Sequence, residues 1–381
     1  MKRNVLLLLL LISALLKISA QEKNKSQWIN NVRLSGYGMI QYQYSNQYLS
    51  KANSFNLRMA RFSLDGRVMN DFYWKAQVQF NGNTSTLGSS PKVVDLFVEW
   101  QKYNCFRVKV GQFKNPFTFE NPMNPIDQGF IGYGQAIMKL AGFTDRVGEH
   151  SSNGRDIGLQ IQGDVLKNES GRDLIHYQLG VFNGQGINVK DVDQQKNIIG
   201  GLWVMPVKGM RIGAFGWTGS YSRKGTWTEM GQDGEAKEHN GVRTLQQRRY
   251  AFSAEYKTND WTLRSEYVHS SGLAFRKALV NTDDPSATDC SLGNLGDKAQ
   301  GVYALVIAPI IKEKFHAKAR YDMYQPTGDA SKMKTQYEFG LDYEFNKNIE
   351  ISGIYALVND KSLAKDHHNY SLLDVQVSYR F

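Results

Sequence analysis

The residues of this 381-residue chain that could do chemistry are charged side chains, because the sequence contains no catalytic motif. Its seven histidines show no spacing typical of metal ligands. GxSxG, HExxH and P-loop patterns do not occur. We therefore predict no catalytic residue, no metal site and no cofactor. The remaining candidates are acids and bases that share one face of segments in which polar and apolar residues alternate.

Alternation against apolar residues predicts which charges point to the polar face. The basic candidates are Arg58, Arg61, Arg67, Lys75, Arg107, Lys109, Arg249, Arg264, Lys318 and Arg320. The acidic candidates are Asp65, Asp95, Glu99, Glu255, Glu266, Asp322, Glu338, Asp342 and Glu344. The two sets nearly balance, although the bases gather on the early segments and acids crowd the segment 336–345. Two interpretations stay open: a transverse field across an enclosed path, or solvated charges that pair across neighbouring strands.

The elements that must position these side chains are sixteen segments with a period of two residues. Each is long enough to cross a bilayer as a tilted strand, which takes about nine to eleven residues. The alternation changes phase at Ala60 and Arg61, which predicts a β-bulge there. The segments are 33–44, 55–68, 72–80, 93–100, 106–113, 156–165, 174–182, 198–207, 211–221, 249–257, 261–269, 299–308, 315–323, 336–345, 349–358 and 370–381.

The connections between the segments alternate between short and long. Short turns such as 69–71, 258–260 and 346–348 are followed by long polar, Gly-rich connections such as 222–244 and 270–298. Outer-membrane barrels have this asymmetry, whereas a soluble all-β protein has no reason to sort its loops in this way. The sequence therefore predicts a 16-stranded antiparallel transmembrane β-barrel, with a soluble all-β fold as the alternative.

The N-terminus indicates export. Lys2 and Arg3 precede an apolar run over 5–16, and small residues at 19–20 come before Gln21, which is typical of a signal peptide over 1–20. One barrel domain is expected over 21–381. The mean hydropathy is −0.46 and no later run is long enough for an apolar span, which excludes a helical membrane protein.

The net charge favours anionic partners. Without Lys2, Arg3 and Lys17 the formal charge falls from +10 to about +7. In an exported protein a modest excess of base indicates anionic solutes or lipid head groups before it indicates nucleic acid. We expect an outer-membrane location and contact with outer-membrane lipid and lipopolysaccharide.

The third long connection, 114–153, is the longest, and a loop of this length is usually functional. It is too apolar for a freely solvated external loop, so we expect it to fold into the lumen and narrow it. The residues expected in this constriction are Lys114, Pro116, Phe117, Phe119, Glu120, Pro122, Pro125 and Asp127.

The same region carries a family resemblance. VGQFKNPFTFE at 110–120 resembles the hallmark of the phosphate-selective porin O/P family, and 55–80, 154–163 and 177–186 are similar to further family segments. The resemblance implies a homotrimeric channel, general or anion-preferring, that lets small hydrophilic solutes diffuse past a third-loop constriction. It also implies an arginine ladder and a loop lysine, for which Arg58, Arg61 and Lys114 are the matches.

The last segment resembles the closing strand of bacterial outer-membrane barrels. Leu373, Val375, Val377 and Tyr379 share one face, and the chain ends on Phe381. In those barrels the final aromatic residue marks the protein for insertion, so the resemblance implies recognition by the barrel-assembly machinery through Phe381. A closed barrel also requires this strand to pair with the first.

Two other functions remain as alternatives. A non-conducting adhesin or binding barrel would use the long external connections 222–244 and 270–298. An outer-membrane hydrolase would need a nucleophile beside a histidine, and His176 and His316 are mid-strand without an evident nucleophile.

Overall fold

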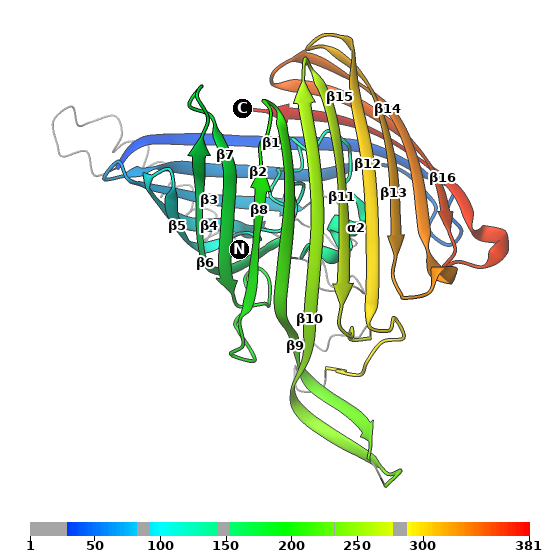
Figure 1. The fold of residues 1–381 in the computed structure, drawn as a ribbon. Coiled ribbons are helices and arrows are strands. Elements are labelled where there is room, and N and C mark those ends of the chain that lie inside the picture. Colours follow the sequence, from blue (N-terminus) through cyan, green and yellow to red (C-terminus); the bar gives the residue numbers. More distant parts are fainter. Residues whose placement is uncertain (1–28, 82–90, 144–151, 232, 277–287) are drawn as a thin grey trace, which may run out of the picture.

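The computed structural model describes residues 29–81, 91–143, 152–231, 233–276 and 288–381. Sixteen antiparallel strands form a closed barrel in which each strand pairs with its neighbours in sequence and β1 pairs with β16 (Figure 1). The predicted barrel is therefore confirmed. The expected signal peptide, 1–20, lies outside the described residues. Within the described part of the chain, no helix has the length and apolar character needed to cross a membrane.

The strands have the following bounds. They are β1 Ile29–Ser45, β2 Ala52–Val68, β3 Phe72–Asn81, β4 Pro91–Tyr103, β5 Phe106–Lys114, β6 Arg155–Lys167, β7 Asp173–Phe182, β8 Asn197–Val204, β9 Met210–Met230, β10 Ala236–Thr258, β11 Trp261–Ser271, β12 Lys298–Ile311, β13 Phe315–Gln325, β14 Lys334–Asn346, β15 Ile349–Asp360 and β16 Asn369–Arg380. The helical elements are α2 Gln135–Leu140 and the 3₁₀ turns η2 Ala330–Lys332 and η3 Lys365–His367.

Along the strands of the wall, apolar and polar side chains largely alternate between the outer surface and the inside of the barrel. On β14, Phe339 and Leu341 are about half exposed on the outer surface, while Glu338 and Asp342 are buried inside. On β16, Val377 and Tyr379 are exposed, and Gln376 is buried. Since successive side chains of a strand point to opposite faces, this pattern gives the barrel an apolar outside and a polar lumen.

The seam closes through the last residue of the chain. Phe381 N donates to Gly36 O, and Gly36 N donates to Phe381 O, both at 3.0 Å. Gly36 leaves room for the terminal ring, because a Cβ at this position would lie 2.5 Å from Phe381 Cζ. The expected pairing of the last strand with the first is thus present.

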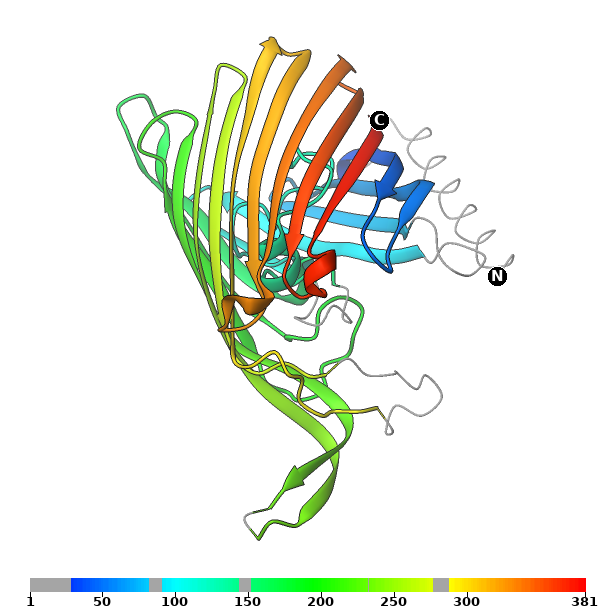
Figure 2. The ribbon, with the colours of Figure 1, turned by 90° about the vertical axis from the view of Figure 1, so that its right-hand side faces the viewer.

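The β9–β10 hairpin differs from the expectation. The sequence predicts a loop over 222–244, whereas β9 and β10 continue far beyond the barrel rim (Figures 1 and 2). The extension lacks an apolar face for lipid, so its alternation could not be recognised as a membrane strand. It is stabilised by a small apolar cluster in which Trp227 and Tyr221 pack around Leu245, Phe275 and Cys290.

The bulge in β2 also lies slightly earlier than predicted. Met39 pairs with Met59 and Ile40 with Leu57, which leaves Arg58 as the extra residue. A bulge reverses the alternation after it, so Arg58 and Arg61 both point into the lumen although their spacing of three would normally separate them.

Residues 115–143 lie inside the barrel. Phe117, Phe119 and Phe130 are buried there in one cluster with wall residues such as Tyr303. Helix α2 packs on β11, β12 and β13. Gly301 on β12 permits this close approach, since a Cβ there would lie 2.7 Å from Ala136 Cβ.

Candidate functional site

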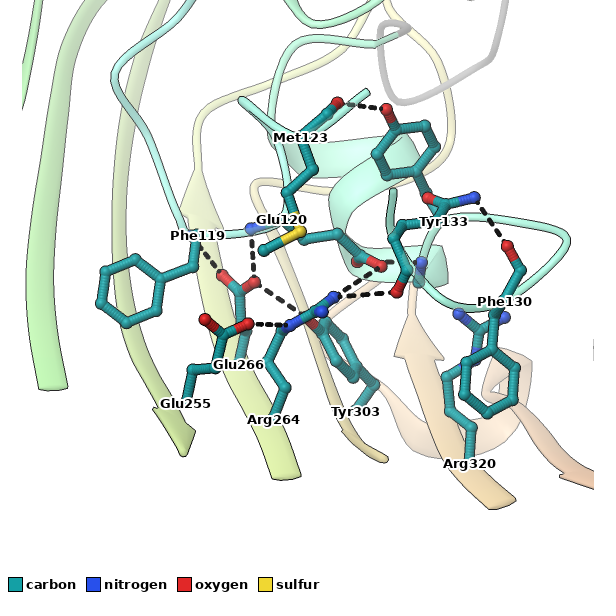
Figure 3. A network of polar contacts seen from close by, with 12 residues as sticks. Phe119, Glu120, Met123, Phe130, Tyr133, Glu255, Arg264, Glu266, Tyr303 and Arg320 are labelled. Atoms are coloured by element: carbon teal, nitrogen blue, oxygen red, sulfur yellow. Dashed lines mark hydrogen bonds and ion pairs between the residues drawn. The ribbon is translucent and has the colours of Figure 1, made fainter. Parts of the chain in front are cut away.

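Two wall carboxylates bind backbone N–H groups of the constriction loop, and one of them, Asp322 on β13, accepts from Gln135 N at 2.9 Å. Glu266 on β11 accepts hydrogen bonds from Phe119 N at 2.9 Å and Glu120 N at 2.7 Å (Figure 3). It also accepts from Ser253 Oγ at 2.6 Å and Tyr303 Oη at 2.8 Å. Hydrogen bonds to a charged acceptor are stronger than those between neutral groups, so Glu266 is the main anchor of the loop.

Arginines of the same wall bind the loop carbonyls while they are paired with acids. Arg264 donates through Nε to Glu255 Oε2 at 2.8 Å and through Nη1 to Gln128 O at 3.3 Å. Arg320 donates to Glu338 and, through Nη1, to Gly132 O at 2.7 Å. These cations are neutralised by wall acids, and their remaining donors position the loop.

Glu120 is the buried acid of the loop itself. Its Oε2 accepts from Gly134 N at 3.2 Å, and its Oε1 lies 3.8 Å from Arg264 Nη1. Burial raises the pKa of Glu120 to about 7, against the opposing effect of Arg264 and Arg320. A carboxyl with this pKa changes its charge near neutral pH.

The opposite wall holds a cluster of bases with few acids, which we call the basic cluster: Arg58, Arg61, Lys114 and Arg155. Arg61 and Arg155 are each about 1% exposed. Arg61 donates through Nε and Nη2 to Gln79 Oε1, whereas its buried Nη1 has no hydrogen-bond partner in the described chain. Arg58 donates to Gln376 Oε1 at 2.7 Å.

Lys114 is the most unusual member of the basic cluster. Its Nζ lies 4.2 Å from the ring centroid of Phe143 and 5.2 Å from that of Tyr133. This nitrogen is buried and finds no hydrogen-bond acceptor among the described residues. A buried ammonium without a partner is costly unless an anion compensates its charge.

Arg155 is a site residue that the sequence analysis missed. It pairs with Lys114 across β5 and β6 and donates through Nε to Asp95 Oδ1 at 2.5 Å. Strict alternation would group Arg155 with Leu159, which faces outward. The strand begins directly after Gly154, whose φ of +70° redirects the chain at the rim, and this local geometry could not be predicted from periodicity.

Most of the other predicted bases pair with acids on adjacent strands. Arg249 instead donates to Leu140 O in α2 at 2.9 Å, and Arg67 donates to Asn70 O at 2.9 Å and Gln101 Oε1 at 3.0 Å. The ion pairs are Lys75–Asp95 at 3.2 Å, Lys109–Glu99 at 3.7 Å, Arg107–Asp164 at 2.5 Å, Lys318–Asp342 at 3.0 Å and Arg320–Glu338 at 2.7 Å. For these residues, cross-strand pairing describes the lumen better than a field between opposite walls.

The residues predicted for the constriction loop divide into buried and exposed ones. Pro116, Phe117, Phe119, Glu120 and Pro125 are buried. Pro122 and Asp127 are exposed, and Asp127 Oδ1 lies 2.9 Å from Arg380 Nη1 at the closing strand.

One group of possible metal ligands was not visible in the sequence. The register of β13 and β14 places His316 beside Asp342, and ligand atoms of His316, Asp342 and Glu344 lie within 4.8 Å of one another. His316 already contacts Asp260 at 2.9 Å and Asp342 at 3.0 Å, and Lys318 also contacts Asp342. These ion pairs account for the arrangement.

Comparison with known proteins identifies the class. The family described as phosphate-selective porin O and P matches residues 34–185, which confirms the resemblance over this stretch. No curated protein matches the chain.

Solved structures share the fold at low identity. An anion-selective porin from Comamonas acidovorans is 13% identical with a TM-score of 0.62, covering 92% of this chain and 99% of that one. OprB of Pseudomonas putida is 9% identical with a TM-score of 0.61, covering 92% and 94%. OmpT of Vibrio cholerae in its trimer form is 11% identical with a TM-score of 0.56, covering 92% and 99%.

The family match and the closed sixteen-stranded barrel together define an outer-membrane porin. The protein is a diffusion channel of the outer membrane.

Proposed function

We propose that this porin prefers anions, and that the basic cluster is the point at which an anion such as phosphate pauses in the channel. The observation that carries the proposal is Lys114 Nζ, which is buried without an acceptor. Phosphate oxygens accept hydrogen bonds from ammonium and guanidinium groups, so an anion bound at the basic cluster would supply the kind of acceptor that Lys114 Nζ and Arg61 Nη1 each lack.

The two lysines of β5 provide a matched test. Lys109 also lies over two aromatic rings, Phe97 at 5.1 Å and Phe113 at 5.3 Å, but Glu99 neutralises it at 3.7 Å. In planar bilayers under a KCl gradient, the reversal potential of the wild type should indicate anion preference. Lys114→Met should reduce that preference and weaken the block of chloride current by phosphate. Lys109→Met should change both quantities much less.

Two results would contradict the proposal. One is cation preference in the wild type. The other is an equal loss of anion preference in both lysine variants, because the unpaired nitrogen would then have no special role. No covalent step is proposed, and purified protein should not cleave lipid or peptide in liposomes.

The oligomeric state and the partners of the protein are proposed from its class, the outer-membrane porins. We propose a homotrimer in outer-membrane lipid and lipopolysaccharide, in support of which the Vibrio cholerae OmpT structure is described as a trimer form. The barrel-assembly machinery would recognise Phe381, whose ring lies at the seam beside Gly36. Deleting Phe381 should lower the yield of heat-modifiable barrel, and semi-native electrophoresis should show a trimer band.

A further inference from the structure

A vestibule of about 380 Å³ lies within the barrel at the end that carries the short turns. It is lined by residues of β1–β3, the tip of the constriction loop, the turn between β14 and β15 and the end of the chain, among them Ser35, Ser63, Gln77, Asn124 and Asn348. Sites for small molecules enclose roughly 300–1,000 Å³. The vestibule therefore has room for a solute much larger than inorganic phosphate.

Two lining residues connect the vestibule to the basic cluster. The ring centroid of Tyr37 lies 5.8 Å from Arg61 Cζ. Gln77 Oε1 accepts from Arg155 Nη2 at 3.4 Å. A second hollow, which Arg155 itself lines, holds only about 60 Å³. Of these two spaces beside the basic cluster, the vestibule is the one that can hold the body of an organic anion.

Most charges of the vestibule are already paired. The ion pairs are Arg33–Asp65 at 3.0 Å, Lys75–Asp95 at 3.2 Å and Arg380–Asp127 at 2.9 Å. Lys347, in the exposed turn after β14, is the lining base without an ion pair among the described residues. The other polar lining groups are hydroxyls and amides, such as those of Ser35 and Asn348, which both donate and accept hydrogen bonds. The vestibule therefore suits a neutral polyhydroxylated group rather than a second phosphate.

We propose that the anions carried by this porin include phosphate monoesters of small polyols, such as sugar phosphates. The phosphate group takes the place of inorganic phosphate at the basic cluster, and the polyol lies in the vestibule. The inference rests on the proposed function, because the basic cluster supplies the phosphate site. It adds the class of the organic solute, which follows from the size and the neutral lining of the vestibule.

The test compares the block of chloride current by inorganic phosphate, glucose 6-phosphate and glucose, with the full-length protein in planar bilayers. In the wild type, glucose 6-phosphate should have a half-blocking concentration about two- to tenfold lower than inorganic phosphate, the gain from one net hydrogen bond. Glucose alone should block far more weakly than its phosphate. Lys114→Met should weaken the block by both phosphates, because both use the basic cluster.

Variants of the vestibule should separate the two phosphates. Asn124→Ala removes a lining amide and should raise the half-blocking concentration of glucose 6-phosphate about two- to tenfold without changing that of inorganic phosphate. Asn359→Ala removes an amide that bonds Asn369 at the opposite end of the barrel and should change neither value. Ser35→Leu removes a lining hydroxyl and narrows the vestibule, which keeps the test decisive if Asn124→Ala disturbs the loop tip through the lost bond to Asp127.

The outcomes separate this inference from the proposed function. If inorganic phosphate blocks the wild type but glucose 6-phosphate blocks no better, only the vestibule proposal is overturned. The same holds if Asn124→Ala and Ser35→Leu leave the block by glucose 6-phosphate unchanged, or if glucose blocks as well as its phosphate. If inorganic phosphate does not block, or if Lys114→Met has no effect on its block, the proposed function itself fails.

Discussion

The two walls that face the constriction loop use the same residue types for different purposes. On β10–β13, Arg264 and Arg320 are paired with wall acids and hold loop carbonyls. On β2, β5 and β6, Arg61 and Lys114 keep a buried nitrogen without a partner. The comparison teaches that the number of charges in a lumen does not indicate function. The paired charges hold the constriction loop, and we propose that the unpaired ones bind an anion.

The strongest test of this contrast is to break the anchor on the paired wall. Glu266→Ala removes the acceptor of two loop amides, which we expect to cost about 3–6 kcal/mol in loop attachment. The loop should move from the lumen, and single-channel conductance in planar bilayers should rise. Glu99→Ala, which removes an inward-facing glutamate beside Lys109, should leave conductance nearly unchanged. Equal conductance in wild type and Glu266→Ala would show that the loop is held in another way.

The next effect is a pH dependence from Glu120. Its pKa in the folded protein is about 7, above the ordinary 4.5, so the attached loop binds the proton more tightly than the free loop does. Loop stability is therefore fully present below about pH 4.5 and falls as pH rises to about 7, by about 3 kcal/mol. Hydrogen exchange of the loop amides should accelerate over this range.

Glu120→Gln keeps the size of the side chain and removes the titration. In this variant, the hydrogen-exchange rate of the loop amides, corrected for the intrinsic pH dependence of exchange, should stay constant between pH 4.5 and 7. A wild-type slope that persists in Glu120→Gln would assign the pH dependence to another group.

A smaller effect is expected on the unpaired wall. Asp95 forms ion pairs with Arg155 and Lys75, and Asp95→Asn removes the negative charge beside both bases. At a separation of about 8 Å in water, one unit charge changes the anion preference by about twofold. The reversal potential should shift toward the anion equilibrium potential. Asp65→Asn, which removes the partner of the exposed Arg33, should shift it less, and the reverse order would contradict the assignment of the basic cluster.

A comparably small effect is expected at the loop tip. Asp127 and Arg380 form an ion pair at 2.9 Å with both side chains more than 40% exposed. Exposed pairs contribute about 0–1 kcal/mol, so Asp127→Asn should alter hydrogen exchange at the tip by less than about fivefold. Asp233→Asn, which breaks a similarly exposed pair with Lys237 in the external hairpin, should leave the tip unchanged. A much larger effect at Asp127 would make the tip a second anchor.

Much of the barrel was predictable because alternation reports the environment of each strand residue directly. The alternation of polar and apolar residues identified all sixteen strands. The alternation of short and long connections indicated which end of the barrel carries the long loops. The failures have local causes. The extension of β9 and β10 has no lipid face, and the bulge at Arg58 depends on a register with β1 that distant residues determine.

By itself, the sequence determined the barrel, the polar lumen and the segment that enters it, because these follow from side-chain polarity along a strand. The tertiary structure decided which charges are paired, because that depends on register across strands and on where the loop packs. Arg155 and Lys114 show the difference: they are forty-one residues apart in sequence and become neighbours only when β5 meets β6. The unpartnered nitrogens of the basic cluster exist only in that folded arrangement.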